Sequence, residues 1–178
     1  MQDLDPAVLA ALETPCYVFD PATVAEDLDE LRQCLGTPVV VSVKACPVLD
    51  LLVRCNPHFT DGIEIASLGE LNLTIGRMSV PRFVNTPAMD DTLIAAALAC
   101  RATLVADSPQ QVRAIESAWA RPAMQNRPPE GIVLRVNAAS LLGKRGPSAD
   151  HFGMDLPTLH RELDRLSGDE ASLQVVGL

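Results

Sequence analysis

Short apolar segments rich in β-branched residues alternate with helix-forming segments along almost the whole 178-residue chain. This alternation is typical of βα units around a parallel sheet, because the chain must return across the sheet before each new strand. It therefore predicts an α/β fold. The predicted strands are residues 39–44, 62–66, 82–85, 102–106, 131–137 and 173–178.

Helix-start signals separate these strands. Asp20–Pro21 and Ser108–Pro109 each place a capping residue before a proline at the first helical position. Ser67 and Glu70 have the spacing of a capping box. Gly36 predicts where the first long helix ends. The predicted helices are residues 21–35, 48–54, 68–75, 90–100, 109–119 and 156–166.

The number of strands indicates part of a barrel. The chain has no glycine fingerprint of a dinucleotide-binding fold and no P-loop. A barrel of eight βα units takes about 250 residues, and this sequence predicts only six barrel strands. We therefore expect an incomplete (β/α)8 TIM-type barrel over residues 21–178, preceded by a lead-in segment, residues 1–20, that contains a strand-like run at 14–20.

Composition excludes several classes of function. The net charge is −9, which argues against a nucleic acid or an anionic membrane as the main partner. There is no apolar run of membrane-spanning length and no basic signal-peptide start, so we expect a cytoplasmic protein. The five cysteines include no C-x-x-C pair, and Cys55 with His58 lacks a second ligand pair. We therefore expect reduced thiols and no metal site.

Lys44 is the residue of greatest chemical interest. It ends a run in which four of the five preceding residues are valine, and Pro47 follows shortly after. A lysine on such a strand either extends its ammonium group to solvent or functions as an amine. Desolvation favours the neutral, nucleophilic amine, which is the form that a Schiff base with a carbonyl cofactor requires. The strand alone leaves both interpretations open.

Six motifs occur in an order that is characteristic of one family. They are residues 14–20 (Thr-Pro-Cys-Tyr-Val-Phe-Asp), 43–45 (Val-Lys-Ala), 64–71 (Glu-Ile-Ala-Ser-Leu-Gly-Glu-Leu), 107–108 (Asp-Ser), 134–137 (Leu-Arg-Val-Asn) and 151–155 (His-Phe-Gly-Met-Asp). Together they resemble the fold type III pyridoxal-phosphate decarboxylases, which include diaminopimelate, ornithine and arginine decarboxylases and share a barrel with alanine racemase. The resemblance extends from about residue 14 to residue 178.

The resemblance implies a role for three residues. Lys44 corresponds to the lysine that forms the Schiff base with pyridoxal 5'-phosphate. Glu64 corresponds to an acidic residue near the cofactor, usually aspartate, and its alternative is a carboxylate at the strand edge. Arg135 corresponds to an arginine near the cofactor, and its alternative is a structural ion pair.

Other motif residues have simpler interpretations. Ser67 and Glu70 are predicted to form a capping box rather than a site. Cys46 stands where the family commonly has asparagine, and we expect a small apolar residue at a strand end. His151 precedes Phe-Gly, where a role in loop ordering or substrate contact is open. His58 and His160 are expected at the surface.

The resemblance also implies the function and the partners. It implies decarboxylation of a small-molecule amino acid, either diaminopimelate- or ornithine-like or a secondary-metabolite substrate that a carrier holds. The family's later barrel strands, with a histidine that stacks on the cofactor, and its C-terminal β-domain have no counterpart in these 178 residues. We therefore expect a homodimer or a complementary C-terminal half chain. The alternatives are a non-catalytic split or truncated half, and racemase-like chemistry on the same barrel.

Overall fold

Six parallel strands form one continuous sheet in the computed structural model, which describes residues 6–13, 15–46, 48–122, 131–141, 151–168 and 173–178. Each strand pairs with its predecessor in the chain, so the order across the sheet is β1-β2-β3-β4-β5-β6. This confirms the predicted α/β class. The strands are β1 (Val41–Ser42), β2 (Ile63–Ile65), β3 (Arg82–Asn85), β4 (Thr103–Ala106), β5 (Gly131–Leu134) and β6 (Gln174–Gly177).

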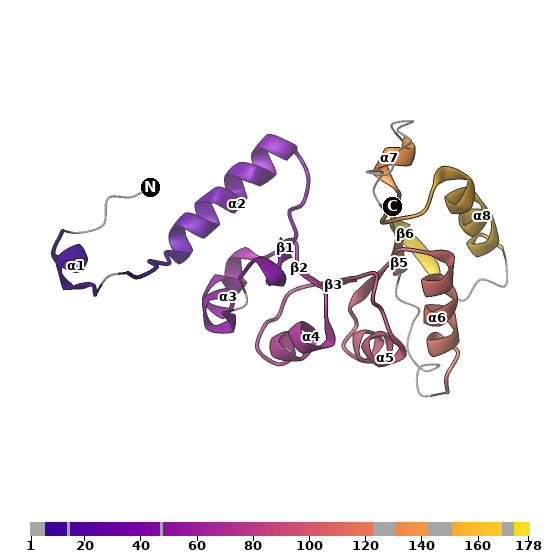
Figure 1. Cartoon of the computed structure of the whole chain (residues 1–178), viewed down its shortest axis with the longest axis horizontal. Helices are drawn as coiled ribbons and strands as arrows, with labels where there is room; N and C mark the ends of the chain where they lie inside the picture. The colour runs from indigo at the N-terminus through magenta and orange to yellow at the C-terminus, as the bar shows by residue number, and fades with distance from the viewer. Residues whose placement is uncertain (1–5, 14, 47, 123–130, 142–150, 169–172) are drawn as a thin grey trace.

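The connections between the strands contain helices at the predicted places. Figure 1 shows α3, α4 and α5 along one side of the curved row of strands, and α1 well apart from the sheet. None of the helices in the described residues is both long enough and apolar enough to cross a bilayer. The helices are α1 (Pro6–Ala11), α2 (Pro21–Leu35), α3 (Leu49–Cys55), α4 (Leu68–Thr74), α5 (Asp91–Ala99), α6 (Pro109–Trp119), α7 (Ala138–Leu141) and α8 (Leu156–Leu166), with 3-10 turns η1 (Val43–Ala45) and η2 (Asn56–His58).

Side-chain caps start the longer helices where the sequence predicts them. The Asp20 carboxylate accepts from Ala22 N at 2.9 Å and begins α2. The Ser108 hydroxyl accepts from Gln111 N at 3.3 Å and begins α6. Each cap satisfies a backbone N–H that has no partner inside its own helix. At the other end of α2, Gly36 adopts a left-handed conformation (φ 63°), which glycine reaches without steric cost.

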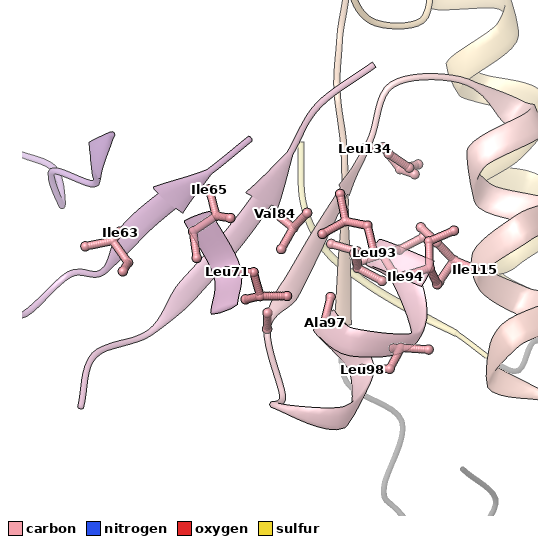
Figure 2. Packing of buried hydrophobic residues seen from close by; sticks show 14 of the residues in the cluster. Ile63, Ile65, Leu71, Val84, Leu93, Ile94, Ala97, Leu98, Ile115 and Leu134 are labelled. Atoms are coloured by element: carbon pink, nitrogen blue, oxygen red, sulfur yellow. The ribbon is translucent and has the colours of Figure 1, made fainter. Parts of the chain in front are cut away.

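Alternate residues of the strands build the core on one face of the sheet. The inward residues of β2 are Ile63 and Ile65, and Val84 of β3 lies beside Ile65 in register. All three are fully buried. Figure 2 shows that Leu93, Ile94, Ala97 and Leu98 of α5 and Ile115 of α6 gather with them and with Leu134 of β5. Aliphatic packing of this kind contributes the main favourable free energy of folding.

An ion pair ties α2 to the rest of the fold. Arg32 Nε donates to the Asp61 carboxylate at 2.6 Å, and Arg32 Nη2 donates to the His58 carbonyl at 2.9 Å. The same carboxylate accepts from Val39 N at 2.9 Å. The hydrogen bond from Val39, followed by that from Arg32, lowers the pKa of Asp61 below its ordinary value.

A second charged cluster joins α6 to α8. Glu162 of α8 is only 5% exposed, and its carboxylate accepts from Arg113 of α6 at 3.0 Å and from Arg165 at 2.9 Å. Arg165 also donates to Glu116 of α6 at 2.7 Å. Two cations therefore compensate the buried carboxylate, which makes the cluster a structural one.

Three strand predictions need correction. Residues 15–20 are not a strand, and Tyr17 among them is fully exposed, because no neighbouring strand in the described residues pairs with this run. The first barrel strand is confined to Val41–Ser42, and Val40 before it is 39% exposed rather than covered on both faces. β5 ends at Leu134, after which Val136 makes only an isolated bridge to Met154.

Candidate cofactor site at the carboxyl ends of the strands

The face of the sheet opposite the core carries polar side chains. In β1 and β2, Ser42 lies beside Glu64 in register. Asn85 of β3 lies beside Val105 of β4 and, two residues beyond the position opposite Glu64, shares its face. Because strand residues alternate between faces, these positions all point away from the buried side. We refer to this side of the sheet as the open face.

Lys44 follows β1 at the carboxyl end of the strands. It belongs to η1 rather than to the strand itself, and its side chain is exposed. The turn is held by Val43, which is 2% exposed, and by the hydrogen bond from Cys46 N to the Val43 carbonyl at 3.1 Å. The buried valine thus anchors the turn and leaves the neighbouring lysine free to reach a ligand. The carboxyl end of the strands is the side on which barrel enzymes carry their chemistry.

Glu64 is held between two neighbouring strands. Its Oε2 accepts a hydrogen bond from the Ser42 hydroxyl of β1, and its Oε1 accepts from Asn85 Nδ2 of β3 at 3.4 Å. Within the described part of the chain, no lysine or arginine forms an ion pair with this half-buried carboxylate. Its negative charge is therefore oriented but not neutralised.

Arg135 lies directly after β5 and is fixed on two sides. Its Nη1 donates to Asp107 Oδ1 at 3.1 Å, and its guanidinium stacks over the Phe152 ring at 4.6 Å from the centroid. Asp107 Oδ1 also accepts from Gly153 N at 3.0 Å. The structural ion pair that the sequence left open is thus present, and among the described residues the other guanidinium nitrogens have no hydrogen-bond acceptor, so they could serve a ligand.

Gly153 explains how the Phe152 segment approaches Arg135. Its φ is +83°, and a Cβ placed there would lie 2.6 Å from the Val136 carbonyl carbon. Only glycine allows this close approach without strain. Met154 N then donates to the Arg135 carbonyl at 2.7 Å, which pins the segment to the sheet.

A cavity of about 640 Å³ opens beside β5 and α8. Asn85 and Arg135 both contribute to its wall, whereas Lys44 and Glu64 do not. Most of its lining is aliphatic, which suits the apolar portion of a small molecule. The lining residues are Asn85, Val105, Val133, Leu134, Arg135, Val136, Leu156, Leu159, His160, Leu163 and Leu178.

The structure thus places Lys44 directly after β1 and Glu64 on the neighbouring strand β2, and it places Arg135 directly after β5, three strands beyond Glu64. Asn85, which connects Glu64 to the cavity, was not predicted as a site residue. One sequence signal could have identified Asn85. It is a polar amide within a predicted strand, two residues after Phe83 and therefore on the same face. His151 is exposed, and no contact with another described residue assigns it a role.

The other motif residues have structural roles. Glu70 N donates to Ser67 Oγ at 3.2 Å, as in the predicted capping box, whereas Glu70 Oε2 accepts from Ala66 N, one residue before the cap, at 2.7 Å. Cys46 is half-buried against the core, and burial raises the pKa of the neighbouring thiol of Cys55. In the described residues, no three histidine, cysteine, aspartate or glutamate side chains gather in a way that could hold a metal ion.

The donor set of this edge fits a cofactor that has a carbonyl group and a protonated ring. Lys44 supplies an exposed amine, and Glu64 supplies an oriented carboxylate without a cationic partner. Asn85 Oδ1 is a buried acceptor that receives no hydrogen bond. Unsatisfied polar groups and unpaired charges are costly to fold, so they are concentrated at functional sites.

Comparison with known proteins identifies the fold. No protein-family model and no curated protein matches the chain. Among solved structures, it is similar to carboxynorspermidine decarboxylase from Campylobacter jejuni, which was crystallised in complex with norspermidine. The TM-score is 0.63 at 16% sequence identity, and the similarity covers 91% of this chain and 40% of that chain.

This similarity agrees with the sequence prediction. The chain aligns over nearly all of its length, and it spans less than half of the decarboxylase. Within the described residues the sheet is open, with β1 and β6 at its edges. The chain therefore shares, over its six strands, the parallel α/β fold of that decarboxylase as part of a barrel, in agreement with the fold that its sequence predicts.

Proposed function

We propose that this chain is the lysine-bearing part of a pyridoxal-phosphate-dependent amino-acid decarboxylase. The observation that carries the proposal is the placement of an exposed amine, Lys44, after β1 and of the hydrogen-bonded Glu64 carboxylate, which has no cationic partner among the described residues, on the neighbouring strand β2. The fold shared with carboxynorspermidine decarboxylase supports it. Residues 21–178 are the cofactor-binding barrel part in this proposal.

The three site residues have distinct tasks. Lys44 would hold the cofactor through its amine, and Glu64 would face a proton-bearing group of the ring. When bound, pyridoxal phosphate supplies an electron-withdrawing ring that accommodates the electron pair left by loss of carbon dioxide. Arg135, already oriented by Asp107 and Phe152, would direct its free donors toward an anionic group.

Lys44 has a second task in this proposal. When it is not engaged with the cofactor, the Lys44 side chain would take up a proton and, as an ammonium group, would deliver it to the substrate carbon that carried the carboxylate. The exposed 3-10 turn suits this task, because the side chain is not locked by packing. We propose a small-molecule amino acid as the substrate.

The chain spans 40% of the similar decarboxylase. We therefore propose that the groups still needed for turnover come from a complementary segment or from a second subunit, as in a dimer. The alternative is a binding half without catalysis of its own. The two are separated by carbon dioxide release, which requires the whole site, whereas capture of the cofactor requires only the Lys44 part.

The test of the cofactor site is covalent capture. The protein is incubated with pyridoxal phosphate and reduced with borohydride, and peptide masses are then measured. The sequence has only two lysines, Lys44 and Lys144, so the assignment is unambiguous. We expect the adduct on the Lys44 peptide, its loss in Lys44→Ala and its retention in Lys144→Ala. Equal labelling of both lysines, or no labelling, would contradict the proposal.

A further inference from the structure

Asn85 has an unusual hydrogen-bonding pattern for a residue next to a core. Its Nδ2 donates to Glu64 Oε1 at 3.4 Å, but its Oδ1 is buried and has no partner. Leaving a buried acceptor without a donor destabilises the fold. Packing alone would favour an apolar residue here, because Val105, its neighbour in β4, is one.

A buried amide nearby, on α6, shows what a purely structural amide looks like. Gln111 of α6 is 8% exposed, and both ends of its side chain are satisfied. Its Oε1 accepts from Asp107 N at 2.7 Å, and its Nε2 donates to the carbonyls of Thr86 and Pro87 at 3.0 and 3.1 Å. The fold can therefore satisfy a buried amide fully, and Asn85 departs from that pattern.

We propose that Asn85 is a positioning residue that orients the Glu64 carboxylate for the cofactor. This inference rests on the proposed function. Ser42 from β1 and Asn85 from β3 hold the two carboxylate oxygens from opposite sides. A carboxylate offers about four lone-pair sites, so two of them remain for a proton-bearing ligand group.

The location of Asn85 adds a second argument. It lines the cavity beside β5 and α8, and its amide reaches back to Glu64 on β2. It is thus the one side chain in the described residues that both lines this cavity and hydrogen-bonds to Glu64. A ligand that extends from the cavity toward β1 would pass over Asn85, which makes its orientation relevant to binding.

The experiment compares Asn85→Leu with Gln111→Leu and with Glu64→Gln. Cofactor affinity is measured by absorbance titration with pyridoxal phosphate, capture at Lys44 by borohydride reduction, and apo-protein stability by thermal unfolding. For Asn85→Leu we expect an unchanged or higher unfolding midpoint, because the unsatisfied acceptor is gone. Affinity for pyridoxal phosphate should fall about ten- to a hundredfold, the effect of losing a hydrogen bond to a charged group.

The matched variants separate positioning from packing. Gln111→Leu should lower the unfolding midpoint because it removes three satisfied bonds, and any effect on affinity should add to that of Glu64→Gln, because none of those bonds reaches Glu64. Starting from Glu64→Gln, adding Asn85→Leu should weaken binding no more than about threefold, since two residues that act through one contact are not additive.

The outcomes distinguish this inference from the function on which it rests. If wild type captures the cofactor at Lys44 and Asn85→Leu binds it equally well, the positioning role is wrong and the proposed function stands. Additive losses in the double variant also overturn the inference. If wild type captures no cofactor, the proposed function fails and the inference fails with it.

Discussion

The two faces of the sheet differ in what they bury. The helix-covered face is mainly aliphatic, with Ile63, Ile65, Val84, Leu104 and Leu134 all at 0–1% exposure. The open face carries Ser42, Glu64 and Asn85 in a hydrogen-bonded row, and Arg135 follows farther along the same edge. Successive residues of one strand therefore serve different purposes.

This difference separates stability from chemistry. Apolar burial on the covered face is favourable at every position and tolerates no polar group without a partner. On the open face, the carboxylate of Glu64 and the amide of Asn85 retain hydrogen-bonding capacity that no partner uses. Selection for stability alone would replace such groups. A fold that stabilises itself through one face can keep such groups on the other. The following predictions test this separation.

The largest effect on stability is expected for the covered face. Val84→Ala deletes two fully buried methyl groups, and we expect the free energy of unfolding to fall by about 2–3 kcal/mol. The matched variant is Val105→Ala on the half-buried open face, which should cost less than half as much. Denaturant unfolding measures both. Equal losses would mean that the two faces contribute alike to stability.

The Phe152 segment beside Arg135 is expected to depend on the positive φ of Gly153. Gly153→Ala forces a Cβ against the Val136 backbone at positive φ, and we expect a loss of about 1–2 kcal/mol. Because Gly153 N also holds Asp107, the arrangement of Arg135 should be disturbed. Gly168→Ala is the control, since its Cβ would lie 3.7 Å from the nearest atom. If Gly153→Ala leaves the free energy of unfolding unchanged, the segment around Gly153 is not held against the sheet.

The attachment of α2 should depend on pH. The pKa of Asp61 lies below its ordinary value of 3.8, so its hydrogen bonds stabilise the fold above pH 3.8 and are lost as pH falls through the folded-state pKa. Asp61→Asn should therefore unfold at a lower temperature than wild type near neutral pH, and the difference should shrink in acid. Asp29→Asn, which affects an exposed partner of Arg32, should show a smaller difference. A difference in unfolding temperature between wild type and Asp61→Asn that widens in acid would contradict this assignment.

The smallest effect on stability is expected where the effect on chemistry is largest. Lys44 is exposed, so Lys44→Ala should change the free energy of unfolding by no more than about 0.5 kcal/mol. The same substitution should abolish cofactor capture. Thermal unfolding and borohydride trapping on one sample measure both. A strongly destabilised Lys44→Ala protein would assign the lysine to packing and not to a ligand.

Much of the fold could be predicted from the sequence because its signals are local. The caps at Asp20 and Ser108 and the stop at Gly36 depend on residues a few positions apart, and the structure has them as expected. The strand predicted at residues 14–20 was wrong over its described part, 15–20, because strand formation depends on residues that are distant in the sequence. A strand requires a partner, and the residues themselves do not show whether one lies alongside.

The site was predictable only in part. The sequence placed Lys44 at the end of the first barrel strand, Glu64 within the second and Arg135 within the fifth; in the structure Glu64 lies in β2, whereas Lys44 and Arg135 follow β1 and β5. The sequence could not show that Arg135 pairs with Asp107, which is 28 residues away, or that Asn85 bonds to Glu64, which is 21 residues away. Such contacts depend on register and on which face a side chain occupies, and a shift of one residue would change both.

The sequential strand order has a consequence for how the molecule opens. Every strand pairs only with strands next to it in the chain, so the sheet resembles a linear stack of similar units. Loss of a terminal unit breaks one strand interface, whereas loss of a central unit breaks two. Amide hydrogens of β3 and β4 should therefore exchange most slowly, and those of β1 and β6 fastest. The lysine turn after β1 would then lie at one of the two ends of the sheet that open most readily. A bound ligand that bridges β1 and β2 would stabilise that end against local opening.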